Sequence, residues 1–212
     1  MRDRKGGAGF GALVLACLIG LALAGASNGD LRAADAPARG SLAGQLLVAS
    51  DNMRDPRFNE TVIYMVEHDM RGAMGLVVNV PLGEVPFADL LERLGLEPEG
   101  ADGSMPVYYG GPVERGRGFF LHSTDVMLEG SIRVADGVAM TAQPDILGAL
   151  ARGEGPSRSL FALGYAGWGP GQLESELAHD AWFVIPAETS LIFAEDPAKT
   201  WQRAVALRSI DL

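Results

Sequence analysis

Short apolar runs bounded by glycine, proline and charged residues recur from residue 45 to the end of the chain. The run at residues 61–68 is rich in β-branched and aromatic residues, and it predicts a strand. A short polar connection separates it from an apolar run at residues 73–79, so the two are predicted to pair as a hairpin. Further strands are predicted at residues 45–50, 107–109, 118–122, 132–134, 138–141, 160–163 and 182–185.

Apolar residues at helical spacing occupy several of the segments between these strands. The first such segment begins at Phe87 and ends at Gly95, a residue that often terminates helices. Short strands with interspersed helices and no repeating βαβ rhythm predict an α+β domain. The number of strands favours a strongly curved antiparallel or mixed sheet that forms a pseudo-barrel, with flanking helices. Further helices are predicted after Thr141, after Gly171 and at residues 198–207.

Residues 1–26 have the three-part layout of a secretory signal peptide. Three basic residues among the first five precede an apolar run at residues 10–24, and small residues follow in an A-x-A arrangement. This pattern predicts cleavage and a periplasmic or secreted mature protein. The alternative is an uncleaved N-terminal anchor that contacts the membrane, because the apolar run is at the short limit for spanning a bilayer.

Downstream of this segment, residues 27–43 are small and polar and predict a flexible lead-in. Residues 44–212 are predicted to form one domain. The single cysteine, Cys17, lies in the signal-like segment, so a cleaved protein would contain no cysteine. That would exclude disulfides and thiol chemistry from the mature chain.

The charge of the chain bears on its partners. With 17 basic and 27 acidic residues, the 212-residue chain carries a net charge of −10 and shows no basic stripe. Binding to nucleic acid is therefore not expected, because it requires basic residues that neutralise phosphates. The alternative would depend on a local patch of Arg115, Arg117 and Arg133. An unidentified protein or small ligand is the expected partner, and no cofactor is expected.

The segment at residues 160–182 holds the most distinctive composition. Its apolar run is predicted to end in a loop with four glycines, followed by a short helix and another strand. A pocket there would be lined by Tyr165, Trp168, Gln172 and Glu174, with the glycines allowing close approach of the backbone. The alternative interpretation makes Trp168 and Trp182 core aromatic residues.

Three histidines are the candidates for acid–base chemistry. Glu67 and His68 close a predicted strand, and neighbours on a strand point to opposite faces, so one pocket would need a bulge to use both. A hydrolase-like enzyme is an alternative hypothesis if these residues converge with His122 in one cleft. The competing interpretation of His122 is a partly buried ring bonded to a backbone carbonyl. His179 suits a helix C-terminus, and no histidine has metal-site spacing, so no metal is expected.

A glycine pair elsewhere in the chain offers another candidate. Gly110 and Gly111 precede Pro112, and their N–H groups would form an anion-binding nest near basic side chains. A tight turn between two strands explains the same glycines.

Several segments together resemble the YqgE/AlgH family of bacterial proteins. The resemblance covers nearly all of residues 44–195 in order and spacing. It implies a compact α/β protein whose sheet folds into a pseudo-barrel, and it implies no agreed reaction; some members are discussed as regulators and others as nucleic-acid binders. The segments that carry the resemblance are residues 44–49, 55–58, 61–68, 72–79, 109–113, 117–122 and 164–177.

Two departures from the family pattern matter. The family usually has Asn-Arg-Pro where this chain has Asn79-Val80-Pro81, so a basic contact at that position would be absent. Family members are usually taken to be cytoplasmic, which is the alternative to export for this chain. The leading hypothesis is a non-enzymatic binding or regulatory protein of the YqgE/AlgH type.

Overall fold

The computed structural model describes residues 40–93, 95–97 and 101–208, all within one structural unit that covers residues 34–212. The predicted signal peptide or anchor lies outside the described residues. Residues 27–39 of the predicted lead-in also lie outside the described residues.

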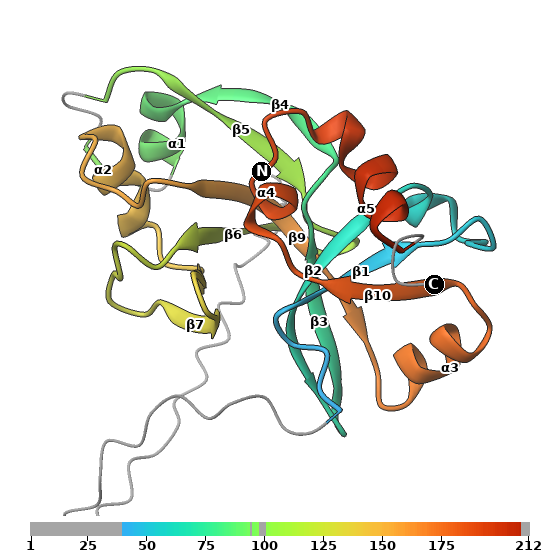
Figure 1. Ribbon diagram of the computed structural model, residues 1–212. Coiled ribbons are helices and arrows are strands. Elements are labelled where there is room, and N and C mark those ends of the chain that lie inside the picture. Colours follow the sequence, from blue (N-terminus) through green and yellow to red (C-terminus); the bar gives the residue numbers. More distant parts are fainter. Residues whose placement is uncertain (1–39, 94, 98–100, 209–212) are drawn as a thin grey trace, which may run out of the picture. The chain divides into compact units, whose positions relative to one another are not determined.

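Ten strands form one curled sheet in the described part of the chain (Figure 1). They are β1 (Gln45–Ala49), β2 (Val62–Asp69), β3 (Gly72–Val77), β4 (Pro81–Pro86), β5 (Ser104–Tyr109), β6 (Val113–Ser123), β7 (Ile132–Ala135), β8 (Val138–Thr141), β9 (Ser159–Trp168) and β10 (Trp182–Pro186). Eight of them follow the order β10-β1-β2-β3-β9-β6-β8-β7, while β5 joins β9 and carries β4. Only β5 and β9 run parallel among these pairs. The predicted α+β class with a strongly curved mixed sheet is confirmed.

Five α-helices flank this sheet within the described residues. The first two helices contact each other at one end of the sheet, and the third lies at the opposite end, where β9 leads into it (Figure 1). The helices are α1 (Phe87–Arg93), α2 (Asp145–Ala151), α3 (Gln172–Ala178), α4 (Thr189–Ile192) and α5 (Thr200–Arg208), with 3-10 turns η1 (Pro56–Phe58) and η2 (Pro197–Lys199).

Both faces of β2 are buried, which explains its nearly continuous apolar sequence. Val62, Tyr64 and Val66 pack in a cluster that includes side chains of α4 and α5. Ile63 and Met65 point to the other face and pack in a cluster that includes α3. This alternation follows from the two-residue period of a strand. Burial also raises the pKa of the Tyr64 hydroxyl group.

Strand β9 is longer than the sequence pattern predicts. The sequence predicts a glycine-rich loop after residue 163. The first half of this prediction is wrong, because Gly164 and Gly167 lie within β9. Gly167 pairs with Met74 of β3, and Gly164 takes a positive φ of 73° where β9 passes the turn between β5 and β6. Only residues 169–171 form the turn into α3.

The turn between β5 and β6 is packed directly against the backbone of β9. The N–H group of Gly110 donates to the Leu163 carbonyl at 2.9 Å, and the Gly110 carbonyl accepts from Val77 N–H at 3.0 Å. A Cβ atom on Gly110 would lie 2.2 Å from the Gly164 carbonyl oxygen, and one on Gly164 would lie 2.5 Å from the Gly111 carbonyl oxygen. These three glycines, which we call the glycine junction, are therefore required by the close approach of two backbones.

Strand β4 was not predicted from the sequence. Pro81 and Pro86 bound it, and its residues are mostly exposed. Among the described strands it pairs with β5 alone, so it is an edge strand, where proline is tolerated.

The glycine junction predicts a large difference between two matched substitutions. Gly110→Ala should lower the free energy of unfolding by about 2 kcal/mol or more, because the new methyl group meets backbone that cannot move aside. Gly116→Ala lies in β6 with no atom within 4 Å of its Cβ, and it should change stability by less than about 0.5 kcal/mol. Denaturant unfolding of both variants tests this, and equal stabilities would contradict the assigned role of the junction.

Candidate functional site

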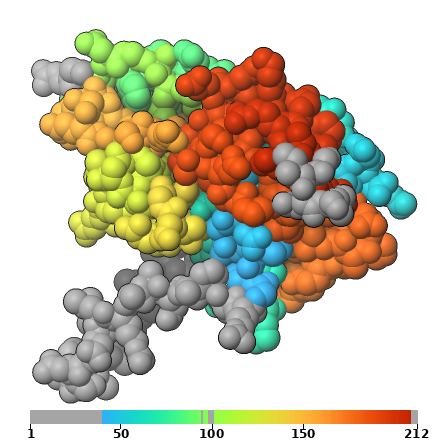
Figure 2. Space-filling view, in the orientation of Figure 1, coloured from blue at the N-terminus to red at the C-terminus, as the bar shows by residue number. Residues whose placement is uncertain are grey.

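The end of the sheet nearest α3 contains a hollow of about 840 Å³ between the loop at residues 51–58 and α3. We call it the α3 cleft. On the face shown in Figure 2, the surface of this loop, in cyan, lies beside that of α3, in orange. Its lining residues are Asp51, Asn52, Met53, Arg54, Asp55, Arg57, Phe58, Pro112, Gly167, Trp168, Gln172, Ser175, Glu176, His179, Ala181 and Trp182.

Glu176 is the centre of a hydrogen-bond network in the wall of this cleft. Its Oε2 atom accepts from the indole N–H groups of Trp168, at 3.0 Å, and Trp182, at 2.7 Å. Its Oε1 atom accepts from Gln172 Nε2 at 3.0 Å, and Gln172 Oε1 accepts from the Gly169 N–H group at 3.1 Å. Because the two tryptophans belong to β9 and β10, the network fastens α3 to both flanking strands.

The opposite wall carries an ion pair of its own. The guanidinium of Arg57 binds the Asp55 carboxylate through Nε and Nη2, at distances from 2.5 to 3.1 Å. This pairing lowers the pKa of Asp55. Asp55 also accepts from the Arg57 backbone N–H group, which fixes the start of η1.

Two smaller hollows lie at the same end of the sheet, one adjoining the α3 cleft and the second adjoining the first. One, of about 550 Å³, includes Glu67 and Tyr165 and shares Trp168 with the α3 cleft. The other, of about 530 Å³, includes His68 and Glu174. The structure therefore brings six predicted residues to one end of the sheet. Glu67 and His68 line different hollows, consistent with their alternation along β2.

His68 joins the described part of the lead-in to α3. Its Nδ1 atom accepts from the Leu42 N–H group at 3.0 Å, so the ring proton is on Nε2 and is donated to Glu174 Oε1 at 2.9 Å. The Ser41 hydroxyl group donates to the His68 carbonyl at 2.9 Å. The pKa of Glu174 is lowered, first by its own backbone N–H group and then by the bond from His68.

His122 lies far from these residues. It is fully buried, with Nδ1–H donating to the Ser123 carbonyl at 2.9 Å and Nε2 bonded to the Ser131 hydroxyl group at 3.2 Å. His122 pairs with Ser159, which begins β9. His68 pairs with Ala73 of β3, and Ala73 in turn pairs with Trp168, which ends β9. Ser159 and Trp168 are about 30 Å apart along an extended strand. Glu67, His68 and His122 do not converge, and His122 lines none of the three hollows.

The two glycines of the predicted anion nest are likewise used by the fold. The Gly110 N–H group is bonded to Leu163, and Gly111 lies against the backbone of Tyr165. The turn interpretation describes this segment, although Pro112 reaches the α3 cleft.

Glu176 was missed by the sequence analysis. Its one local signal is the four-residue spacing from Gln172, which puts both side chains on the same helix face.

Comparison with known proteins places the chain in a family. A family model described as AlgH-like matches residues 46–212. The chain belongs to the AlgH-like family. A UPF0301 protein of Rhodospirillum rubrum is 45% identical over 172 residues, covering 81% of this chain and 90% of that protein. A UPF0301 protein of Sphingopyxis alaskensis is 48% identical over 168 residues, covering 79% and 89%. The family resemblance in the sequence is confirmed.

Solved structures agree with this membership. The solution structure of the AlgH protein from Pseudomonas aeruginosa matches with a TM-score of 0.68 at 39% identity, covering 82% of this AlgH-like chain and 92% of that chain. A crystal structure of a Corynebacterium diphtheriae protein matches with a TM-score of 0.59 at 24% identity, covering 76% and 84%. The second likeness concerns the fold alone.

No three His, Cys, Asp or Glu side chains in this part of the AlgH-like chain are grouped so that they could hold a metal ion. None of its described helices has both the length and the hydrophobicity that a membrane crossing requires.

The geometry of His68 predicts that its ring protects one backbone amide of the lead-in. Nδ1 of His68 is the acceptor of the Leu42 N–H group, so His68→Ala removes that acceptor. The hydrogen-exchange protection factor of the Leu42 amide should fall in this variant, whereas that of Gly44, bonded to the Met65 carbonyl, should not. NMR exchange measurements on the wild-type protein and the variant at one pH test this. Unchanged protection of Leu42 in His68→Ala would refute the assigned hydrogen bond.

Proposed function

We propose that the protein acts by binding, as a non-enzymatic binding or regulatory protein whose ligand occupies the α3 cleft. The observation that carries this proposal is the Glu176 network, which fixes a charged group and two indole rings in the wall of a hollow. The volume of about 840 Å³ lies in the range of small-molecule sites, which combine apolar walls with a few oriented polar groups.

The competing functions receive less support. A hydrolase based on Glu67, His68 and His122 needs those side chains in one cleft, and the β9 register separates them. Nucleic-acid binding needs free cations, but Arg117 pairs with Glu114 at 3.1 Å and the chain is strongly acidic.

Filling the cleft tests the proposal. A small-molecule fragment library, screened by ¹H–¹⁵N NMR, should yield binders that shift the indole N–H signals of Trp168 and Trp182. Ser175→Tyr projects a large side chain from the cleft wall and should weaken those binders at least tenfold. Ser190→Tyr makes the same change on α4, outside this cleft, and should leave them unchanged. Absence of binders, or binders unaffected by Ser175→Tyr, would overturn the proposal.

We also propose that the protein is exported, on the strength of the signal-like layout of residues 1–26. Intact mass and cell fractionation in the native host test this. The expected species is recovered from the envelope or medium and is shorter by about 24–26 residues. A full-length cytosolic species would reject export and favour the cytoplasmic alternative.

A further inference from the structure

We infer that the α3 cleft recognises an organic cation, an alkylammonium or guanidinium group, through the carboxylate of Glu176. This inference rests on the proposed binding function of the cleft and adds the chemical class of the ligand.

The first argument concerns charge. Glu176 is half-buried, and no Lys, Arg or His among the described residues lies within ion-pair distance of it. Elsewhere in the cleft, Asp55 is paired with Arg57, and Asp51 and Arg54 carry opposite charges on the same loop. The remaining charge of the α3 cleft is thus the negative charge of Glu176. A carboxylate withdrawn from water gains most from a cationic partner.

The second argument concerns the acceptor sites of the carboxylate. The two indole N–H groups use both lone pairs of Oε2, whereas Oε1 accepts from Gln172 alone among the residues that the structure describes. One acceptor site on Oε1 therefore stays open to a donor. Three bonds hold the carboxylate in place, so a ligand would bind without first reorienting it.

The third argument concerns the walls. Trp168 and Trp182 are at most 7% exposed, so they mainly orient Glu176. The accessible apolar surface comes from Phe58 and Met53, which are half-buried. The guanidinium carbon of Arg57 already lies 5.8 Å from the centre of the Phe58 ring, so an aromatic surface that attracts cations is present in this cleft.

Three probes of similar size and different charge separate the possibilities: n-butylammonium, n-butanol and butyrate. Titrations of the wild-type protein are followed through the indole N–H signals of Trp168 and Trp182. We expect n-butylammonium to bind at least tenfold more tightly than n-butanol, and butyrate to bind no better than n-butanol.

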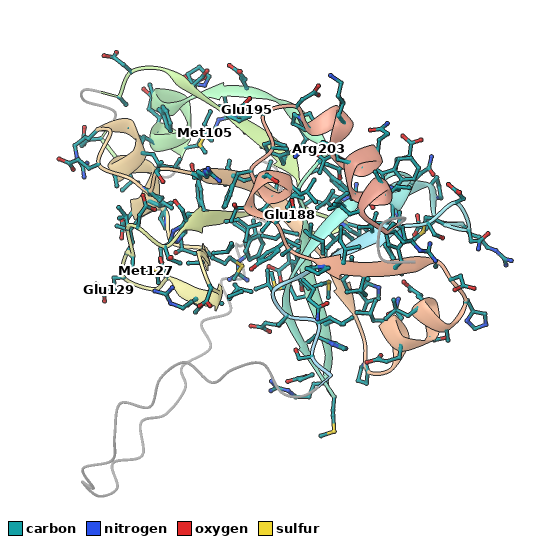
Figure 3. The ribbon with its side chains drawn as sticks, viewed as in Figure 1. Met105, Met127, Glu129, Glu188, Glu195 and Arg203 are labelled. Carbon is teal, nitrogen blue, oxygen red and sulfur yellow. The ribbon has the colours of Figure 1, made fainter. Side chains whose placement is uncertain are left out.

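Substitutions locate the effect. Glu176→Gln should reduce n-butylammonium binding at least tenfold and leave n-butanol binding nearly unchanged. Glu195→Gln removes the same charge from a side chain outside the cleft, beyond α4 (Figure 3), and should change neither. If Glu176→Gln does not fold, the comparison of the three probes on the wild-type protein still decides the matter.

The source of the cation is tested with a capped lysine, Nα-acetyl-lysine methylamide. Tighter binding than n-butylammonium would indicate the side chain of a partner protein, and weaker binding would indicate a free amine. Equal binding of n-butylammonium and n-butanol, or preferred binding of butyrate, would overturn the cation inference while leaving the cleft a binding site. No binding of any probe would also overturn it, and the fragment screen then decides separately whether the cleft binds a ligand.

Discussion

The close backbone contact at the glycine junction is the constraint on which the rest of the structure depends. It brings the turn between β5 and β6 against the middle of β9, and it leaves no space for a side chain on Gly110 or Gly164. Because of this contact, β9 pairs with β5 and β6 in its first half and with β3 in its second. Trp168 is thereby delivered to the end of the sheet where α3 begins.

Two carboxylates then attach α3 to the rest of the AlgH-like domain. Glu176 binds the indole groups of β9 and β10, and Glu174 binds His68 of β2. The second contact is more exposed, with 55% of the Glu174 side chain accessible. Since α3 borders both the α3 cleft and the hollow that includes His68 and Glu174, a ligand that moves α3 would act on both carboxylates at once. A binding event in the α3 cleft would thus be transmitted to His68 and to the lead-in bonded to it.

The sequence was a good guide to features that depend on local pattern. The strand and helix order around β2, β3 and α3 follows from hydrophobic periodicity. The aromatic residues and glycines that gather in this segment indicate Trp168 and Gln172, and both line the α3 cleft. The extension of β9 through Gly164 was not predictable, because it depends on contact with a turn distant in sequence.

The errors at individual side chains have a similar cause. His122 is bonded to a backbone carbonyl, as its competing interpretation in the sequence has it, but its complete burial depends on the packing of β6 between β8 and β9. Glu176 looks like an ordinary helix-surface residue until β9 and β10 bring two indole groups to it. β4 was missed because its prolines are strand breakers except at an edge.

The order of the strands also bears on how quickly the chain folds. Ala49 pairs with Trp182, Ala73 pairs with Trp168, and the Trp201 indole donates to the Ala49 carbonyl across 152 positions of sequence. Contacts so distant require large loops to close before they stabilise anything, and such topologies fold slowly. The sheet can be completed only after the last quarter of the chain has been synthesised. A newly made chain of this kind therefore stays unfolded for longer than one whose strands pair with their neighbours in sequence.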